Sequence, residues 1–140
     1  MKTKTKKERY IDYLYLIAMA AIAVWVAYGK GWIFADFESV DAKKAVTMLR
    51  DDTNVTVVDV RTPKEYASGH VKGAISLPLG RLEDDIATLT PYKTHKLIVY
   101  CRSGNRSIAA SRILTSHGFT PVNVKGGIIA LAQAGAHIVK

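Results

Sequence analysis

The sequence predicts an α/β layered domain with a mostly parallel central sheet flanked by helices, preceded by one transmembrane helix. Strand-like and helix-like segments alternate through residues 37–140, which is typical of a parallel sheet with helical crossovers. Residues 55–60 form an almost continuous β-branched run, as expected of a strand buried on both faces. Residues 13–29 carry no charge, which predicts the transmembrane helix.

Length and composition limit the classes of protein that the chain can be. Its 140 residues suffice for one compact domain, and the single cysteine excludes an intrachain disulfide and a Cys-rich metal site. The net charge is +8, and half of it falls on residues 1–30, which hold six Lys/Arg and two acids. The sequence shows no basic stripe interleaved with aromatics, so we expect no nucleic-acid partner.

We expect four parts: a basic tail at 1–12, a transmembrane helix at 13–29, a linker at 30–36 and the domain at 37–140. The 17 uncharged residues just suffice to cross a bilayer core of roughly 30 Å and to contact membrane lipid. Aromatic residues lie at both ends, as in membrane aromatic belts: Tyr10, Tyr13 and Tyr15, then Trp25, Tyr28 and Trp32.

The same segment allows two other interpretations. A cleaved signal peptide would explain the basic start and the Ala27-Tyr28-Gly29 sequence, which fits a cleavage site. A buried core helix fits poorly, because the segment has no polar face. Five Lys/Arg precede the segment and three follow it, so the positive-inside rule favours, by a small margin, a single-pass protein with its domain outside the cytoplasm, in a bacterium the periplasm.

The first half of the domain reads as two strands and a helix. Residues 37–40 predict a short strand, and Ser39 or Asp41 can cap a helix that runs to about Arg50. The buried strand at 55–60 follows after a polar turn.

The second half repeats the alternation. We expect strands at 74–77 and 97–100, and between them a helix at 81–89 with Leu82, Ile86 and Leu89 on one face.

After the strand at 97–100 the pattern becomes helical again. A helix is expected from Ser107 to His117, with Gly118 as its C-terminal cap. A strand at 121–124 follows, and Gly126-Gly127 opens a last helix over 128–134.

The turn between the strand at 97–100 and the helix at 107–117 holds the only cysteine, Cys101. A strand-to-helix turn directs backbone N–H groups into one concavity, and the helix dipole adds positive charge there. Arg102 and Arg106 add two full charges. We therefore expect the pKa of the Cys101 thiol to be lowered, so that it acts as a thiolate nucleophile. A buried structural cysteine is the alternative.

The loop and three other motifs resemble the rhodanese-type sulfurtransferases. The loop has Cys101 and Arg106 separated by four residues. The other motifs end or follow the strand at 55–60 and read Asp59-x-Arg61, Glu65-Tyr66 and Gly69-His70-Val71-x-Gly73-Ala74. The resemblance covers about residues 37–140. The chain departs from the family at Leu131, where tryptophan is common, and at Lys125, where an acid is common; both departures concern local packing.

The resemblance implies a sulfurtransferase without a metal or organic cofactor. It would move a sulfane sulfur from a donor such as thiosulfate to cyanide or a thiol through a persulfide on Cys101. It also implies that Asp59 and Arg61 form a supporting charge pair, and that Glu65 and His70 are structural.

Roles for the loop residues follow from the same resemblance. The active loop comprises Arg102, Ser103, Gly104, Asn105, Arg106 and Ser107, whose amides would surround the persulfide. Arg102 would attract an anionic donor, and Arg106 would stabilise the loop and its charge. Gly104 supplies backbone freedom. Ser107 would cap the helix or donate a hydrogen bond to the persulfide.

Two other classes of function remain. A membrane-tethered binding or regulatory module could use the same loop to dock a membrane-protein partner, with little turnover. A phosphatase or arsenate reductase would use a Cys–Arg loop one residue longer, so the gap of four residues argues against it.

Overall fold

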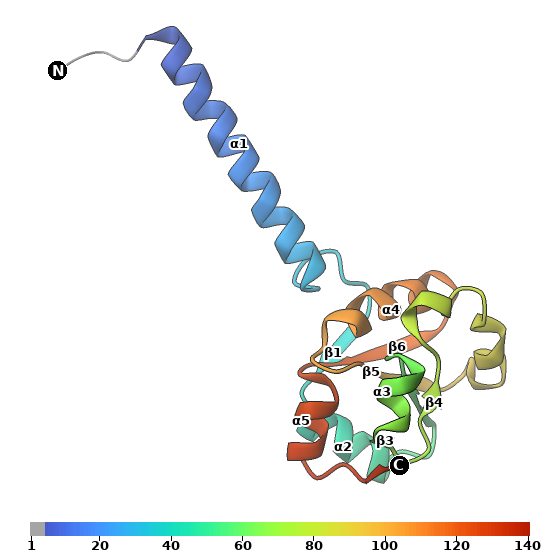
Figure 1. The fold of residues 1–140 in the computed structure, drawn as a ribbon. Helices are drawn as coiled ribbons and strands as arrows, with labels where there is room; N and C mark the ends of the chain where they lie inside the picture. Colours follow the sequence, from blue (N-terminus) through green and yellow to red (C-terminus); the bar gives the residue numbers. More distant parts are fainter. Residues whose placement is uncertain (1–4) are drawn as a thin grey trace. The chain divides into compact units, whose positions relative to one another are not determined.

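The computed structural model describes residues 5–140, which divide into two compact units. One unit ends at Phe34 and the other runs from Ala35 to Lys140. Each is described by itself, and Figure 1 gives the order of their elements.

The first unit is built on one helix, α1 (Lys6–Gly29). It begins at Lys6, inside the predicted tail, because Thr5 and Glu8 form a capping box: Thr5 Oγ1 accepts the amide of Glu8, and the Glu8 carboxylate accepts the amide of Thr5. Residues 1–4 of the predicted tail lie outside the described residues. By length and composition, α1 is long and apolar enough to cross a membrane.

The second unit contains a five-stranded, all-parallel sheet in the order β1-β6-β5-β2-β4. The strands are β1 (Glu38–Val40), β2 (Val55–Asp59), β4 (Ile75–Ser76), β5 (Lys96–Tyr100) and β6 (Thr120–Val124). The carboxyl ends of parallel strands lie at the same edge of a sheet, which is where ligands bind in such folds. Cys101 follows the end of β5 directly.

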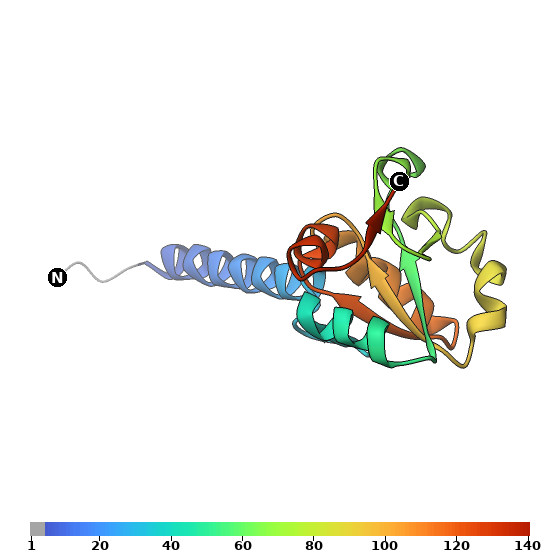
Figure 2. The ribbon, with the colours of Figure 1, turned by 90° about the horizontal axis from the view of Figure 1, so that it is seen from below.

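Helices cover both faces of this sheet (Figures 1 and 2). The helices are α2 (Ala42–Asp51), α3 (Pro63–Ala67), α4 (Asn105–Ser116) and α5 (Gly127–Gln133). Ile98 of β5 packs in a cluster with α2 and α5, whereas Leu97 and Val99 pack in a second cluster with α4. Because successive side chains of a strand point to opposite faces, a continuous apolar run serves both clusters. Asp41 caps α2 by accepting the amide of Lys44.

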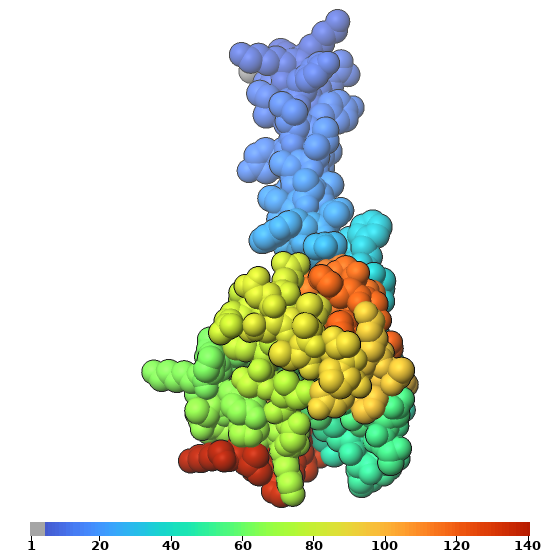
Figure 3. All heavy atoms as spheres, turned by 90° about the vertical axis from the view of Figure 1, so that its right-hand side faces the viewer, coloured from blue at the N-terminus to red at the C-terminus, as the bar shows by residue number. Residues whose placement is uncertain are grey.

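The predicted helix at 81–89 is wrong. The segment forms two 3₁₀ helices instead, η1 (Leu79–Arg81) and η2 (Ile86–Tyr92). Pro91, inside η2, has no N–H to donate to the carbonyl of residue 87, and its ring disfavours an α-helical turn there. Leu82 and Leu89 are nevertheless fully buried, as their spacing indicated. Figure 3 shows the yellow 79–92 segment covering this side of the domain beside the orange α4.

A second, small sheet pairs β3 (His70–Val71) with β7 (Ile138–Val139) in antiparallel fashion. Its strands are two residues long and nearly seventy positions apart in sequence. It joins the end of the chain to the turn that follows α3.

Candidate active site

The loop after β5 folds around the sulfur atom of Cys101. The side chain is only 1% exposed, and the amide of Gly104 donates a hydrogen bond to Sγ at 3.1 Å. Ser107 Oγ lies 3.7 Å from Sγ, on the first turn of α4. Neutral peptide groups thus surround a sulfur that has little contact with water.

This environment changes the acidity of the thiol. Burial alone raises the pKa of Cys101, because it disfavours the charged form. The amide and hydroxyl of Ser107 and the amides of Gly104 and Ser103 act the other way and outweigh burial, so the pKa lies below its ordinary value. A lowered pKa increases the thiolate fraction at neutral pH, and the thiolate is the nucleophilic form.

Gly104 gives the loop its tight curvature. Its φ of +100° lies in the left-handed region, and a Cβ there would lie 3.0 Å from the amide nitrogen of Gly126. Gly104 is also the N-cap residue of α4, which begins at Asn105, so the prediction that Ser107 caps the helix is wrong. Ser107 instead donates to the carbonyl of Gly104 at 3.2 Å while its hydroxyl stays near Sγ.

Arg106 is held by Glu65 of α3. Two hydrogen bonds of 2.8 and 2.7 Å join the guanidinium to both carboxylate oxygens. The guanidinium, aided by the amide and hydroxyl of Thr62, holds the pKa of Glu65 far below its usual range although burial opposes this. Glu65 also caps α3 by accepting from Thr62. The positive charge of Arg106 is therefore compensated, while Arg102 is exposed.

A buried ion pair lies at the end of β2, the strand next to β5. The Arg61 guanidinium donates to both oxygens of Asp59, with a shortest distance of 2.7 Å, and also to the carbonyl of Gly69 at 2.6 Å. Asp59 is fully buried and Arg61 is 4% exposed. The structure thus shows the expected charge pair, and its supporting role stays a prediction.

Tyr100 belongs to the same network, and the sequence did not single it out. Its hydroxyl donates to Asp59 Oδ2 at 2.7 Å and accepts the amide of Val71 at 3.0 Å. Burial raises the pKa of Tyr100 above its usual range, and the hydrogen bond to Asp59 adds to the rise. The position of Tyr100 directly before Cys101, opposite Asp59 in the β2–β5 register, could have pointed to it.

His70 contacts the α3 segment and not the loop. Its ring stacks on Tyr66 with centroids 3.7 Å apart, and Nδ1 lies 3.0 Å from the Tyr66 carbonyl oxygen. That His70 has a structural role stays a prediction.

The turn before α5 supports the active loop from the other side, which sequence reasoning also missed. The amide of Ile128 donates to the carbonyl of Cys101 at 2.8 Å. Gly127 has φ +58°, and a Cβ there would collide with the carbonyl oxygens of Cys101 and Arg102. The Gly126-Gly127 pair is the sequence signal for such a close approach.

The fold and this loop define a class of α/β domains with a cysteine at the carboxyl end of a parallel sheet. The chain belongs to the rhodanese family: the family described as Rhodanese-like domain matches residues 41–134. The resemblance and the predicted fold class are therefore confirmed.

Individual relatives are consistent with this family assignment. The chain is 41% identical to thiosulfate sulfurtransferase PspE of Escherichia coli (strain K12) over 76 residues, 54% of this chain and 73% of PspE. It is 37% identical to a sulfurtransferase of Allochromatium vinosum over 101 residues, 71% of this chain and 92% of that protein. Among solved structures, a rhodanese-related protein of Thermoplasma volcanium matches with a TM-score of 0.66 and 31% identity, covering 74% of this chain and 98% of that one. These relatives support sulfur transfer at the level of the family.

Proposed function

We propose that the domain transfers a sulfane sulfur from a donor such as thiosulfate to a thiol or cyanide through a persulfide on Cys101. The observation that carries the proposal is the Cys101 sulfur, which accepts a backbone N–H at 3.1 Å and has a lowered pKa. The same amides suit a persulfide anion, because they are fixed donors and need no reorganisation.

The chemistry balances without an external oxidant or reductant. The Cys101 thiolate attacks the outer sulfur of thiosulfate and forms a new S–S bond. The S–S bond within thiosulfate breaks, and sulfite leaves with the bonding electron pair. The acceptor then attacks the outer sulfur of the persulfide, and the Cys101 thiolate returns as the leaving group.

The loop residues would have different roles in the sulfur transfer. Exposed Arg102 would attract an anionic donor, and the amides of residues 102–107 would stabilise the sulfur anion. Arg106 would act through its ion pair with Glu65, which fixes the loop to α3.

The experiment compares the full chain with its Cys101→Ser variant in detergent. The wild type should form thiocyanate from thiosulfate and cyanide, and after incubation with thiosulfate its intact mass should increase by one sulfur atom. The variant should show neither result. Turnover that survives in the variant excludes the mechanism, whereas a stable persulfide with negligible turnover on every donor would favour the regulatory module.

We further propose that residues 13–29 form a single-pass anchor, with a tail at 1–12, a linker at 30–36 and the catalytic domain at 37–140 outside the cytoplasm. Expression in a bacterial host tests this placement. The intact chain should remain in the membrane fraction, and protease added to spheroplasts should digest the domain. A soluble product shortened near Gly29 would identify a signal peptide instead.

A further inference from the structure

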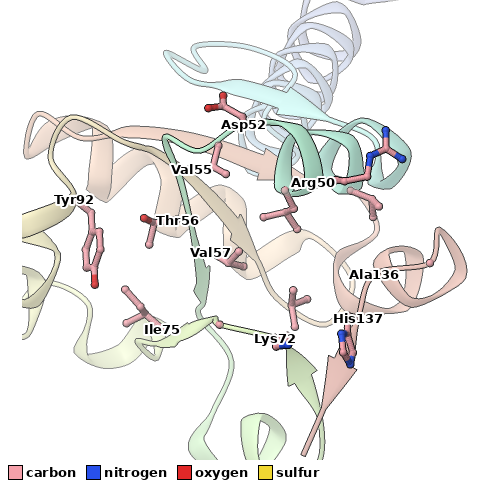
Figure 4. Close-up of a pocket in the computed structure, with 15 residues that line it drawn as sticks. Arg50, Asp52, Val55, Thr56, Val57, Lys72, Ile75, Tyr92, Ala136 and His137 are labelled. Carbon is pink, nitrogen blue, oxygen red and sulfur yellow. The ribbon is translucent and has the colours of Figure 1, made fainter.

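A groove lies along the first half of β2, whereas Cys101 follows the end of β5. Its volume is about 610 Å³, within the roughly 300–1,000 Å³ of ligand sites. Its lining includes the branched aliphatic side chains of Val46, Leu49, Val55, Val57, Val71 and Ile75. Figure 4 shows β2 running through the middle of this β2 groove, with Tyr92 and Ile75 on one side and Ala136 and His137 on the other.

One edge of β2 is open along the groove. β2 pairs with β5 at every residue from Val55 to Asp59, but with β4 only at Val58 and Asp59. Since β4 ends the strand order on this side, no strand in the described part of the chain pairs with this edge of β2 from Val55 to Val57. An open edge of this kind is a template for another strand.

Hydrogen bonds at both ends of β2 show which residues face β5. The carbonyl of Asn54 accepts the amide of Lys96 at 3.0 Å, and the amide of Val60 donates to the carbonyl of Tyr100 at 3.1 Å. Backbone groups alternate along a strand, so the even-numbered residues between them face β5 as well.

The odd-numbered residues therefore face the other edge. The carbonyl of Asp59 confirms this direction, because it accepts the amide of Leu77 on the β4 side at 2.9 Å. By the same alternation, the N–H groups of Val55 and Val57 point to the open edge. They are two residues apart, about 6.6 Å, which is the repeat of an extended peptide.

The charges along the groove differ from end to end. Near the start of β2, Arg50 is paired with Asp51 at 2.6 Å, and the Asp52 carboxylate accepts the amide two residues later. At the other end Lys72 and His137 lie on adjacent segments, joined by a backbone hydrogen bond of 2.8 Å. Within residues 5–140 the Lys72 ammonium has no hydrogen bond or ion pair, so an uncompensated positive charge lies at this end of the groove.

We propose that the β2 groove binds an extended segment of a partner protein, which adds a strand to the open edge and places a carboxylate side chain near Lys72. Backbone hydrogen bonds to Val55 and Val57 would give the affinity, and the apolar floor would receive alternate side chains. This docking site is separate from the Cys101 loop and does not depend on the proposed sulfur transfer.

A synthetic peptide tests the proposal on the full chain in lipid nanodiscs. The probe is an acetylated and amidated peptide of alternating threonine and valine that ends in glutamate. Hydrogen exchange of the 54–58 segment should slow at least tenfold when the peptide is saturating. Thiocyanate formation should stay unchanged, because the groove residues are not part of the loop.

Matched peptides and variants separate strand addition from apolar adsorption. N-methylation of the peptide's central amides should weaken its binding about fivefold or more, because hydrogen bonds to the edge are lost. Replacing glutamate by lysine should weaken binding two- to fivefold, and Lys72→Glu should reverse that preference. Val55→Pro removes an edge donor without touching the β5 ladder and should also weaken binding.

Three outcomes would overturn the proposal. The first is equal affinity for the methylated peptide, which would show an apolar site without strand addition. The second is the absence of binding at millimolar peptide. The third is protection of the 54–58 segment that increases with protein concentration alone, which would assign the edge to a second copy of the chain.

Discussion

Two ion pairs lie near the active loop, and they differ in burial. Asp59–Arg61 lies at the end of β2 with side chains 0% and 5% exposed, whereas Glu65–Arg106 lies beside the loop with side chains 30% and 35% exposed. The Tyr100 hydroxyl connects the buried Asp59–Arg61 pair to β5, the strand that leads into the loop. The Glu65–Arg106 pair includes a residue of the loop itself. We therefore expect stability and chemistry to depend on different pairs: Asp59–Arg61 should matter more for the free energy of unfolding, and Glu65–Arg106 should matter more for the pKa of the Cys101 thiol.

Arg61→Ala should cause the largest loss of stability. It leaves the Asp59 carboxylate buried without its partner and should cost about 3–5 kcal/mol of unfolding free energy. Denaturant titration followed by circular dichroism measures this loss. The control replaces both partners, Asp59→Leu with Arg61→Met, and should cost less than Arg61→Ala alone. If the double variant has a lower free energy of unfolding than Arg61→Ala, then the loss of stability in Arg61→Ala does not come from an unpaired charge.

Gly127→Ala should cause the next largest loss of unfolding free energy, about 2–4 kcal/mol. The new Cβ would collide with two carbonyl oxygens, and the alanine would keep a positive φ that is strained for a residue with a side chain. Gly135→Ala is the matched control, since its φ is +89° but nothing lies within 4 Å of its Cβ. The control should cost only about 1 kcal/mol. Equal losses in the two variants would show that only backbone strain matters and that the α5 turn does not support the loop.

Much of the fold around the loop could be predicted from the sequence, because it follows from patterns of neighbouring residues. The β-branched run at 55–60 predicted a buried strand, and β2 occupies Val55–Asp59. The loop at Cys101 and its position after β5 followed from one strand-to-helix transition. The resemblance implied that Asp59 and Arg61 form a charge pair, and the general rule that buried charges are paired favours the same arrangement.

The features that the sequence did not predict depend on contacts between segments that are distant in the chain. The pairing of β3 with β7 joins two-residue strands that carry no periodicity of their own. The 3₁₀ turns at 79–92 keep the apolar spacing of an α-helix, so the pattern at Leu82 and Leu89 could not distinguish the two. The role of Gly127 requires knowing that α5 returns to the loop.

Removing one charge of the Glu65–Arg106 pair should change the pKa of the Cys101 thiol more than it changes the stability of the fold. Glu65→Gln should cost only about 0.5–1 kcal/mol, because the pair is partly exposed. It leaves the Arg106 charge uncompensated near Sγ, so the pKa of Cys101 should fall further. Arg106→Gln should raise that pKa. The pH dependence of iodoacetamide alkylation of Cys101, the only cysteine, measures both shifts. Shifts of the same sign in both variants would mean that the loop rearranges.

The smallest effect is a dependence of stability on pH. The folded-state pKa of Glu65 is depressed, so its contribution is present above the unfolded-state value near 4.3 and is lost as pH falls through the folded-state pKa. Unfolding free energies of the wild type and Glu65→Gln should therefore differ at pH 7 and converge as the solution is acidified below about pH 4. Asp51→Asn is the control, since its pair with Arg50 is fully exposed and should contribute almost nothing at any pH. A difference between wild type and Glu65→Gln that stays constant down to pH 2 would show that the carboxylate charge is not what stabilises this corner of the domain.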